Sequence, residues 1–231
     1  MGENIKKITK AFVVDLDSRE NQNILKPSAR PFNNQAHQVD EAAKKIYELI
    51  EDAKHPNDDI ILNRNKIKEA FFSPFKPQLK DAQVFLSHSH ADKNKALKVK
   101  NYLESETNHR VFIDSLFWDY KDDVLNKLAE YDNTSKIEDA FTLILRESLQ
   151  DMIEKCPYFV FLQSNNSVSN QGLSRTTYSA WIYKELKIPH SIRESRPTPT
   201  MESWQVSHNI SPFLESLETI TLSKLSHIIN S

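Results

Sequence analysis

The chain has 231 residues, which fits one domain with an extension or two small domains. Its 30 basic and 32 acidic side chains leave a net charge of −2, so neither a nucleic-acid backbone nor an acidic membrane is favoured as the main partner. The single cysteine, Cys156, excludes an internal disulfide and a site built from several thiolates.

Two further features of the sequence limit the classes of protein to which the chain can belong. The only glycines are Gly2 and Gly172, so the sequence contains neither a P-loop nor a GxGxxG dinucleotide-binding loop. The opening MGENIKKITK lacks the apolar run of a signal peptide, and no apolar stretch is long enough to span a membrane. Together with the cysteine usage, this predicts a cytoplasmic protein.

Residues 1–80 are expected to form a mainly helical N-terminal extension. Val39–Ala53 and Asp58–Phe72 carry apolar side chains at helical spacing, and Pro74 and Pro77 end the second segment. The earlier run Ala11–Val14 is only a short apolar patch. We therefore expect a domain boundary between residues 80 and 81.

Residues 81–231 alternate between apolar runs typical of buried strands and segments with helical spacing. The expected strands are Ala82–Leu86, Val111–Ile113 and Tyr158–Leu162, with weaker ones near His190–Arg193 and Thr219–Leu222. The expected helices are Asp92–Ser105, Asp122–Tyr131, Ile137–Lys155, Thr177–Leu186 and Leu225–Ile229. This alternation predicts an α/β domain with a parallel sheet of about five strands, flanked by helices, and a ligand site beyond the carboxyl ends of the strands.

The first motif, Ser87-His88-Ser89-His90-Ala91-Asp92, follows the first of these strands and contains the spacing HxHxD. This spacing is found in the metal site of metallo-β-lactamase-fold hydrolases, but there a histidine follows the aspartate, and here that position is Lys93. No other histidine stands in a recognisable ligand motif. The simpler interpretation is a polar loop in which Asp92 caps the next helix.

The second motif is Val111-Phe112-Ile113-Asp114, a strand ending in a carboxylate, followed by Phe117, Trp118 and Tyr120. Asp114 can accept a hydrogen bond from a ribose hydroxyl, or it can satisfy backbone donors in a turn. The aromatic residues either pack on the core, which we favour for Phe117, or stack on a base or nicotinamide, an option open for Trp118.

The third motif, Ser179–Leu186, places Trp181 and Glu185 four residues apart, on one face of a helix. A Trp–Glu pair of this kind usually reflects packing alone. However, the string SAWIYKEL matches the SxWxxxEL pattern of Toll/interleukin-1 receptor (TIR) domains, and the order VFLS, VFID, YFVFL, SAWIYKEL is also similar to theirs. Over about Gln83–Leu186 the chain resembles stand-alone bacterial TIR proteins, including the signal-producing enzymes of Thoeris antiphage defence, although Ala180 replaces a common proline.

The resemblance implies a flavodoxin-like TIR fold and an NAD⁺ glycohydrolase or cyclase that splits the nicotinamide–ribose bond. NAD⁺ would be the substrate, with no cofactor or metal, and the product an ADP-ribose-derived messenger, such as a cyclic ADP-ribose, that activates a separate effector. Self-association through the TIR domain is also implied. The implied roles are catalysis by Glu185 and substrate binding by Ser87, His88, Asp114, Trp118 and Trp181.

The chemistry of this reaction is compatible with one carboxylate. Loss of nicotinamide leaves an oxocarbenium-like ribose that a nearby negative charge stabilises or captures. Nicotinamide departs neutral and needs no general acid, in keeping with the lack of a second carboxylate motif beside Glu185 in the sequence. Two other functions stay open: a non-catalytic TIR interaction module, in which Glu185 would have no purpose, and a zinc hydrolase using His88, His90 and Asp92.

Overall fold

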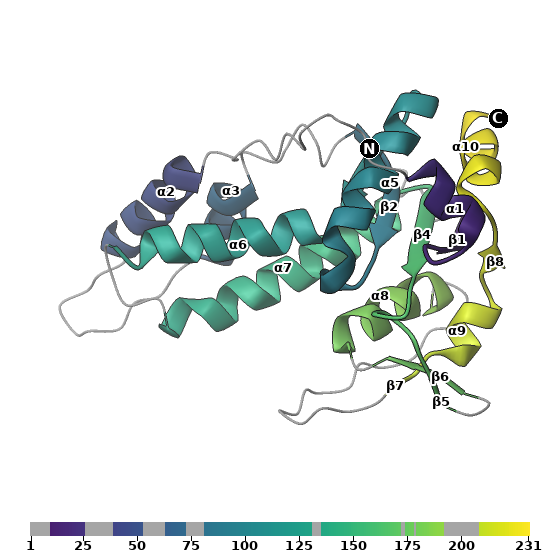
Figure 1. Ribbon diagram of the computed structural model, residues 1–231. Coiled ribbons are helices and arrows are strands. Elements are labelled where there is room, and N and C mark those ends of the chain that lie inside the picture. The colour runs from purple at the N-terminus through teal and green to yellow at the C-terminus, as the bar shows by residue number, and fades with distance from the viewer. Residues whose placement is uncertain are drawn as a thin grey trace. The chain divides into compact units, whose positions relative to one another are not determined.

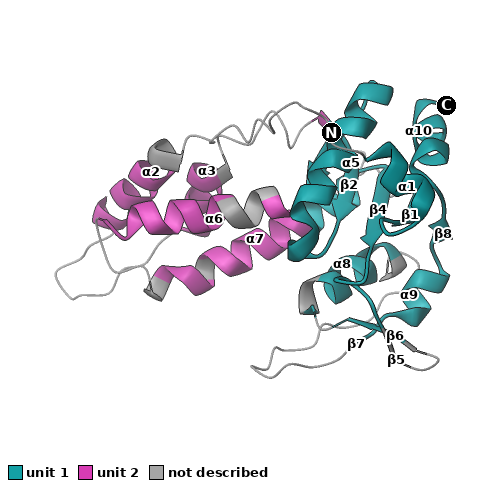
Figure 2. Cartoon of the chain, in the orientation of Figure 1, with its two compact units in different colours: residues 1–32, 82–114, 150–231 teal, residues 33–81, 115–149 magenta. Residues whose placement is uncertain are grey.

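The computed structural model describes residues 10–25, 39–52, 63–72, 81–130, 135–171, 174–177, 179–191 and 208–231 (Figure 1). The chain forms two compact units, each assembled from separate segments (Figure 2). Unit 1 comprises Met1–Phe32, Ala82–Asp114 and Gln150–Ser231, and unit 2 comprises Asn33–Asp81 and Ser115–Leu149. No helix in these described ranges is both long enough and apolar enough to cross a membrane.

Unit 1 contains a five-stranded parallel sheet with the order β3-β2-β4-β1-β8. The strands are β1 (Lys10–Asp15), β2 (Ala82–Ser87), β3 (Arg110–Ile113), β4 (Tyr158–Gln163) and β8 (Glu218–Thr219). The predicted α/β class, with a parallel sheet of about five strands flanked by helices, is confirmed, and the arrangement is consistent with a flavodoxin-like fold. The N-terminal strand β1 occupies the place beside β4 that the flavodoxin-like order gives to a strand later in the chain.

The apolar runs explain why the sheet forms from these segments. The central strand β4 pairs with β1 on one side and β2 on the other, and Phe159–Leu162 are completely buried. Such continuous apolar runs are typical of strands covered on both faces. The Phe85 ring lies 5.9 Å from that of Phe159 and 5.7 Å from that of Phe112, which ties three neighbouring strands together.

The other elements of unit 1 connect or cover the strands. The helices are α1 (Arg19–Ile24), α5 (Lys93–Glu106), α8 (Ala180–Ser191), α9 (Ser211–Glu215) and α10 (Leu222–Asn230), with a short 3₁₀ turn, η2 (His90–Asp92). Helix α5 packs beside β3, and α10 packs against α5. A small antiparallel sheet joins β5 (Ser169–Gln171), β6 (Ser174–Thr177) and β7 (His208–Asn209).

Unit 2 consists of helices α2 (Val39–Asp52), α3 (Arg64–Phe72), α6 (Ser115–Leu128) and the part of α7 (Ser135–Lys155) up to Leu149. Helix α2 packs against both α3 and α6. The Phe71 ring lies 4.9 Å from that of Tyr120 and 5.2 Å from that of Phe141, and all three are buried. The Tyr120 hydroxyl donates to the Phe71 carbonyl at 2.9 Å, so Tyr120 is a core residue of the helical unit.

Several expected elements differ from those found. Lys10–Asp15 is a strand of the sheet, so the prediction of an N-terminal extension ending at residue 80 is wrong for β1. The helical segments of that region share unit 2 with Ser115–Leu149, so the units divide the chain elsewhere than between residues 80 and 81. The expected strand near His190–Arg193 is also wrong for its first two residues, because α8 continues to Ser191, and residues 192–193 lie outside the described ranges.

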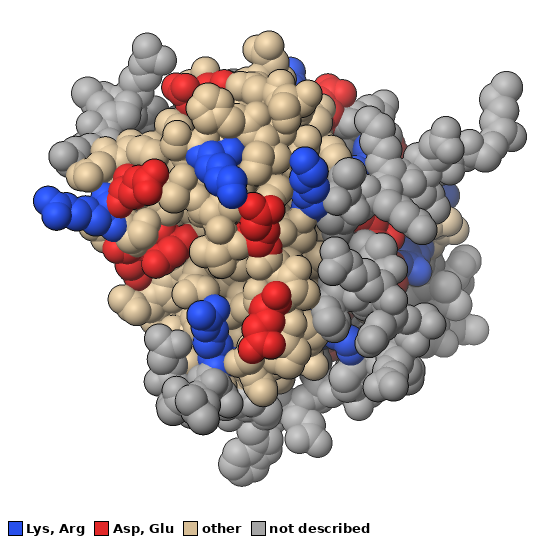
Figure 3. Space-filling view, turned by 90° about the vertical axis from the view of Figure 1, so that its right-hand side faces the viewer, with Lys and Arg blue, Asp and Glu red and all other residues tan. Residues whose placement is uncertain are grey.

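The small net charge is visible on the surface. On the face drawn in Figure 3, acidic and basic side chains are interspersed and do not segregate into patches of one sign. Lys224 and Glu218 form one exposed pair of this kind in unit 1, with Nζ and Oε1 3.0 Å apart. The described part of this face therefore provides no concentrated positive field for a polyanion.

Candidate functional site

The carboxyl ends of the parallel strands bring polar residues to one edge of the sheet. Strand β2 ends at Ser87, Asp114 follows β3, and Ser164 follows β4. The sheet order reverses at β2, whose neighbours β3 and β4 lie on opposite sides. In open α/β sheets this switch point is where ligands bind. Two predicted site residues, Ser87 and Asp114, therefore meet at the edge where the fold would place a ligand site, together with Ser164, which was not predicted.

Glu185 reaches this edge from helix α8. The helix begins directly after Ser179, whose Oγ accepts a hydrogen bond from the Ile182 N–H at 3.3 Å, as a helix-capping serine does. The Ser87 hydroxyl donates to Glu185 Oε2 at 2.5 Å. Ser87 is fully buried and Glu185 is 3% exposed. Two residues predicted for one site are thus in direct contact, although they are 98 positions apart.

His88 and Asp114 form a second contact beside the first. His88 Nε2 lies 3.2 Å from Asp114 Oδ1, and His88 Nδ1 lies 2.7 Å from the carbonyl oxygen of Ser89. Both side chains are buried. Because each ring nitrogen faces an acceptor, the imidazole can donate to both only when both nitrogens carry hydrogen. The carbonyl of Ser89 and the carboxylate of Asp114 together fix the orientation of the ring.

The carboxyl groups of Glu185 and Asp114 also interact. Burial raises the pKa of Glu185 well above its usual value, the negative charge of Asp114 raises it further, and a proton held between the two carboxyl groups acts in the same direction. The hydrogen bond from Ser87 opposes these effects. Glu185 Oε1 is buried without a hydrogen-bond partner in the described part of the chain. The site therefore holds two carboxyl groups, whereas the sequence around Glu185 indicated one.

The HxHxD residues do not come together as metal ligands. His88 is bonded to Asp114 and Ser89, His90 is exposed, and Asp92 is buried. Asp92 occupies the N-cap position of α5, but its carboxylate bonds no N–H of that helix, so the predicted cap is wrong. Across the described ranges no group of three or more histidine, cysteine, aspartate and glutamate side chains is arranged to hold a metal ion.

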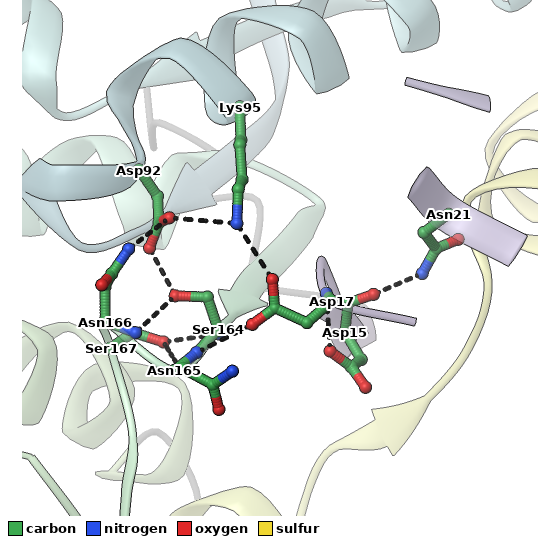
Figure 4. A network of polar contacts seen from close by, with 9 residues as sticks. All are labelled: Asp15, Asp17, Asn21, Asp92, Lys95, Ser164, Asn165, Asn166 and Ser167. Atoms are coloured by element: carbon green, nitrogen blue, oxygen red, sulfur yellow. Dashed lines mark hydrogen bonds and ion pairs between the residues drawn. The ribbon is translucent and has the colours of Figure 1, made fainter. Parts of the chain in front are cut away.

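The carboxylate of Asp92 instead belongs to a polar network that joins the loops after β1, β2 and β4 (Figure 4). It accepts hydrogen bonds from Ser164 Oγ and, at 2.9 Å, from Asn166 Nδ2. Lys95 Nζ lies 2.9 Å from Asp17 Oδ1 and 3.6 Å from Asp92 Oδ1. This network was not predicted from the sequence. The polar run Ser164–Ser167, directly after β4, is the sequence feature that could have indicated it.

Asp17 anchors the outer end of this network. The backbone N–H of Asn165 donates to Asp17 Oδ2 at 3.0 Å, and this bond, with that from Lys95, lowers the pKa of Asp17. The same ion pair raises the pKa of Lys95. Both side chains are partly exposed, so the pair itself contributes little to stability. Its significance is geometric, because it fastens the loop after β1 to the loop after β4.

For two of the predicted substrate-binding residues, the structure describes the helix but not the side chain. Trp118 is a residue of α6 and Trp181 a residue of α8, but their side chains lie outside the described part of the structure. Their predicted roles in substrate binding stay predictions. Ser87, His88, Asp114 and Glu185, by contrast, form one buried set of contacts.

Comparison with known proteins adds no relative to this picture. No protein-family model matches the chain, and neither curated proteins nor solved structures gave a significant match.

Proposed function

We propose that this chain is a TIR-domain NAD⁺ glycohydrolase or cyclase that acts in the bacterial cytoplasm during antiphage defence. It would cleave the nicotinamide–ribose bond and release an ADP-ribose-derived signal that acts on a separate effector. The proposal originates in the motifs VFLS, VFID and SAWIYKEL. The observation that supports it best is the contact of Glu185 with Ser87 and Asp114 at the carboxyl edge of a parallel sheet.

The raised pKa of Glu185 suits a substrate that brings its own positive charge. Without substrate, burial and Asp114 favour the neutral acid. The nicotinamide ring of NAD⁺ is a cation, and a cation near Glu185 favours its ionised form. The carboxylate would thus become charged when substrate arrives. As the bond breaks, nicotinamide takes the bonding electrons and leaves neutral, and the positive charge develops on the ribose beside Glu185.

The remaining contacts assign roles to the neighbouring residues. Ser87 donates to one oxygen of Glu185 and stabilises the ionised form. The other oxygen, Oε1, is buried without a hydrogen-bond partner among the described residues, and in the proposed complex it would accept a hydrogen bond from a ribose hydroxyl. Asp114, held by His88, adds a second negative charge for the developing cation. Attack on the ribose by water then gives ADP-ribose. Attack by a nucleophilic atom of the substrate itself gives a cyclic product.

The decisive experiment compares NAD⁺ consumption by wild-type protein and by Glu185→Gln. Nicotinamide release and ADP-ribose products are measured by mass spectrometry, with purified protein and in expressing cells with and without phage. We expect Glu185→Gln to lower the rate by at least about a hundredfold. The matched control is Glu215→Gln, which changes an exposed carboxylate on α9 and should leave the rate unchanged.

The same experiment addresses the non-catalytic alternative. If wild-type protein releases no nicotinamide either when purified or in infected cells, an interaction module without catalysis is favoured. If Glu185→Gln cleaves NAD⁺ as fast as wild type while remaining folded, the assignment of Glu185 is wrong.

A further inference from the structure

In the loop between β2 and α5, the backbone carbonyl of Ser89 has two contacts. It accepts a hydrogen bond from the Asp92 N–H at 2.8 Å, and His88 Nδ1 lies 2.7 Å from the same oxygen. The backbone of Asp92 and the ring of His88 therefore share a single acceptor. A shift of Asp92 would move that acceptor and alter the orientation of the ring.

The Asp92 side chain fastens this loop to the one after β4. Only 1% of Asp92 is exposed, and a carboxylate so deeply buried depends on its donors, Ser164 Oγ and Asn166 Nδ2. Those donors are themselves fixed: the Asn166 N–H donates to Ser164 Oγ at 3.0 Å, and the Ser164 N–H donates to Ser167 Oγ at 2.8 Å. The two loops thus behave as one bonded unit around Asp92.

The outer part of the network fixes this unit to β1. Lys95 bridges Asp92 and Asp17, and Asp17 also accepts from the Asn165 N–H (Figure 4). Carboxylates and amides from three strand ends therefore converge around Asp92 and Asp17. The backbone of Ser87–Asp92 connects this network to the Ser87–Glu185 and His88–Asp114 pairs.

We propose that Asp92 is a positioning residue of the buried site: by tying the loop after β2 to the loop after β4, it orients His88 toward Asp114. The consequence for catalysis rests on the function proposed above. The effect on the His88 ring does not, and it provides a test that is independent of NAD⁺ cleavage.

The test uses Asp92→Asn and Ser164→Ala in the full chain. Asparagine keeps one acceptor oxygen and replaces the other with a donating NH₂ group. The Ser164 hydroxyl must then turn from donor to acceptor or lose its bond, and the negative charge beside Lys95 is removed. Ser164→Ala removes the hydroxyl donor and leaves Asp92 intact. The matched control is Glu106→Gln, which removes a negative charge from an exposed position on the same helix, α5.

The first readout is the NMR signal of the His88 ring nitrogens in protein labelled with ¹⁵N-histidine, assigned with His88→Gln. Nitrogen shifts report hydrogen bonding at each ring position. We expect Asp92→Asn and Ser164→Ala to shift the His88 signals, and Glu106→Gln to leave them unchanged. A role in stability alone would not alter these signals in protein that remains folded.

The second readout is the kinetics of nicotinamide release. Misoriented reacting groups lose interactions made in the transition state, so kcat should fall on the order of tenfold to a hundredfold while KM changes little. A rise in KM of the same size, with kcat unchanged, would instead mean that Asp92 contributes to substrate binding. That result would overturn the positioning role.

The two proposals fail in different ways. If wild-type protein releases no nicotinamide but the His88 signals shift in both variants, the proposed function fails and the positioning role stands. If the His88 signals of folded Asp92→Asn and Ser164→Ala match those of wild type, the positioning role is wrong whatever the activity. Should Asp92→Asn not fold, Ser164→Ala decides by the same criterion.

Discussion

Removing the Ser87 hydroxyl should shift the pH dependence of NAD⁺ cleavage toward alkaline pH. The hydroxyl donates to Glu185 Oε2 at 2.5 Å, and this bond lowers the pKa of a carboxyl that burial and Asp114 otherwise raise. Ser87→Ala removes only one oxygen atom from a fully buried position, so the fold should persist. The direct effect falls on the ionised form of Glu185, which loses its donor.

The size of the effect follows from the type of bond. A hydrogen bond to a charged group stabilises it by about 1.5–3 kcal/mol. Every 1.4 kcal/mol is a tenfold change in an equilibrium constant, so the ionised fraction of Glu185 at a fixed pH below its pKa should fall by about 10- to 150-fold. Nicotinamide release at a pH below the pKa of Glu185 should fall by the same factor and recover as the pH is raised.

Initial rates of nicotinamide release across a pH series test this expectation. A ¹³C titration of the Glu185 carboxyl, assigned with Glu185→Gln, measures the same ionisation without turnover. Ser105→Ala, at an exposed position of α5, is the matched control and should follow wild type. A Ser87→Ala profile that superimposes on wild type, or that moves toward acid pH, would refute the reasoning.

Two further predictions concern stability. Because the pKa of Glu185 is raised above its unfolded value of 4.5, the folded state binds the proton more tightly. The resulting stabilisation is complete below pH 4.5 and is lost as the pH rises through the folded pKa. Urea unfolding at several pH values should therefore show wild type losing stability with rising pH relative to Glu185→Gln, and parallel pH profiles would contradict this. In unit 2, Tyr120→Phe leaves the buried Phe71 carbonyl without its 2.9 Å donor and should lower the free energy of unfolding by about 1–3 kcal/mol. Tyr102→Phe, at a half-buried position on α5, is the control, and both variants are measured by chemical denaturation. If both lower the free energy of unfolding by the same small amount, the Tyr120 hydrogen bond does not stabilise the helical unit.

The strands that sequence reasoning found were those with continuous apolar runs. AQVFL and YFVFL became β2 and β4, because a strand buried on both faces has no polar face to break the run. Ala11–Val14 has the same character, but its local pattern indicates no more than a short apolar patch. The stability of this strand depends on its pairing with β4. Because β4 is so distant in the chain, the pairing cannot be read from the local periodicity of the sequence.

The site was predictable to the extent that parallel topology determines it. Strand ends at Ser87 and Asp114 must lie at the same edge, which follows from the order of elements alone. The pairing of Ser87 with Glu185 and of His88 with Asp114 depends on the packing of α8 and of the loop after β2, which local sequence does not specify. Asp92 illustrates the difference: its position before a helix predicted a cap, but donors from a distant loop hold its carboxylate instead.

The order of strands in the sheet has a consequence for synthesis on the ribosome. Strand β1 emerges first, yet its neighbours β4 and β8 are made only after both segments of unit 2. Strand β4, which lies between β1 and β2, is also translated late, and Glu185 follows it. Long-range pairing of this kind is slow to form. A nascent or truncated chain that stops before Tyr158 thus lacks the strand that joins the two halves of the sheet, and the buried carboxyl pair assembles only after Glu185 has been made.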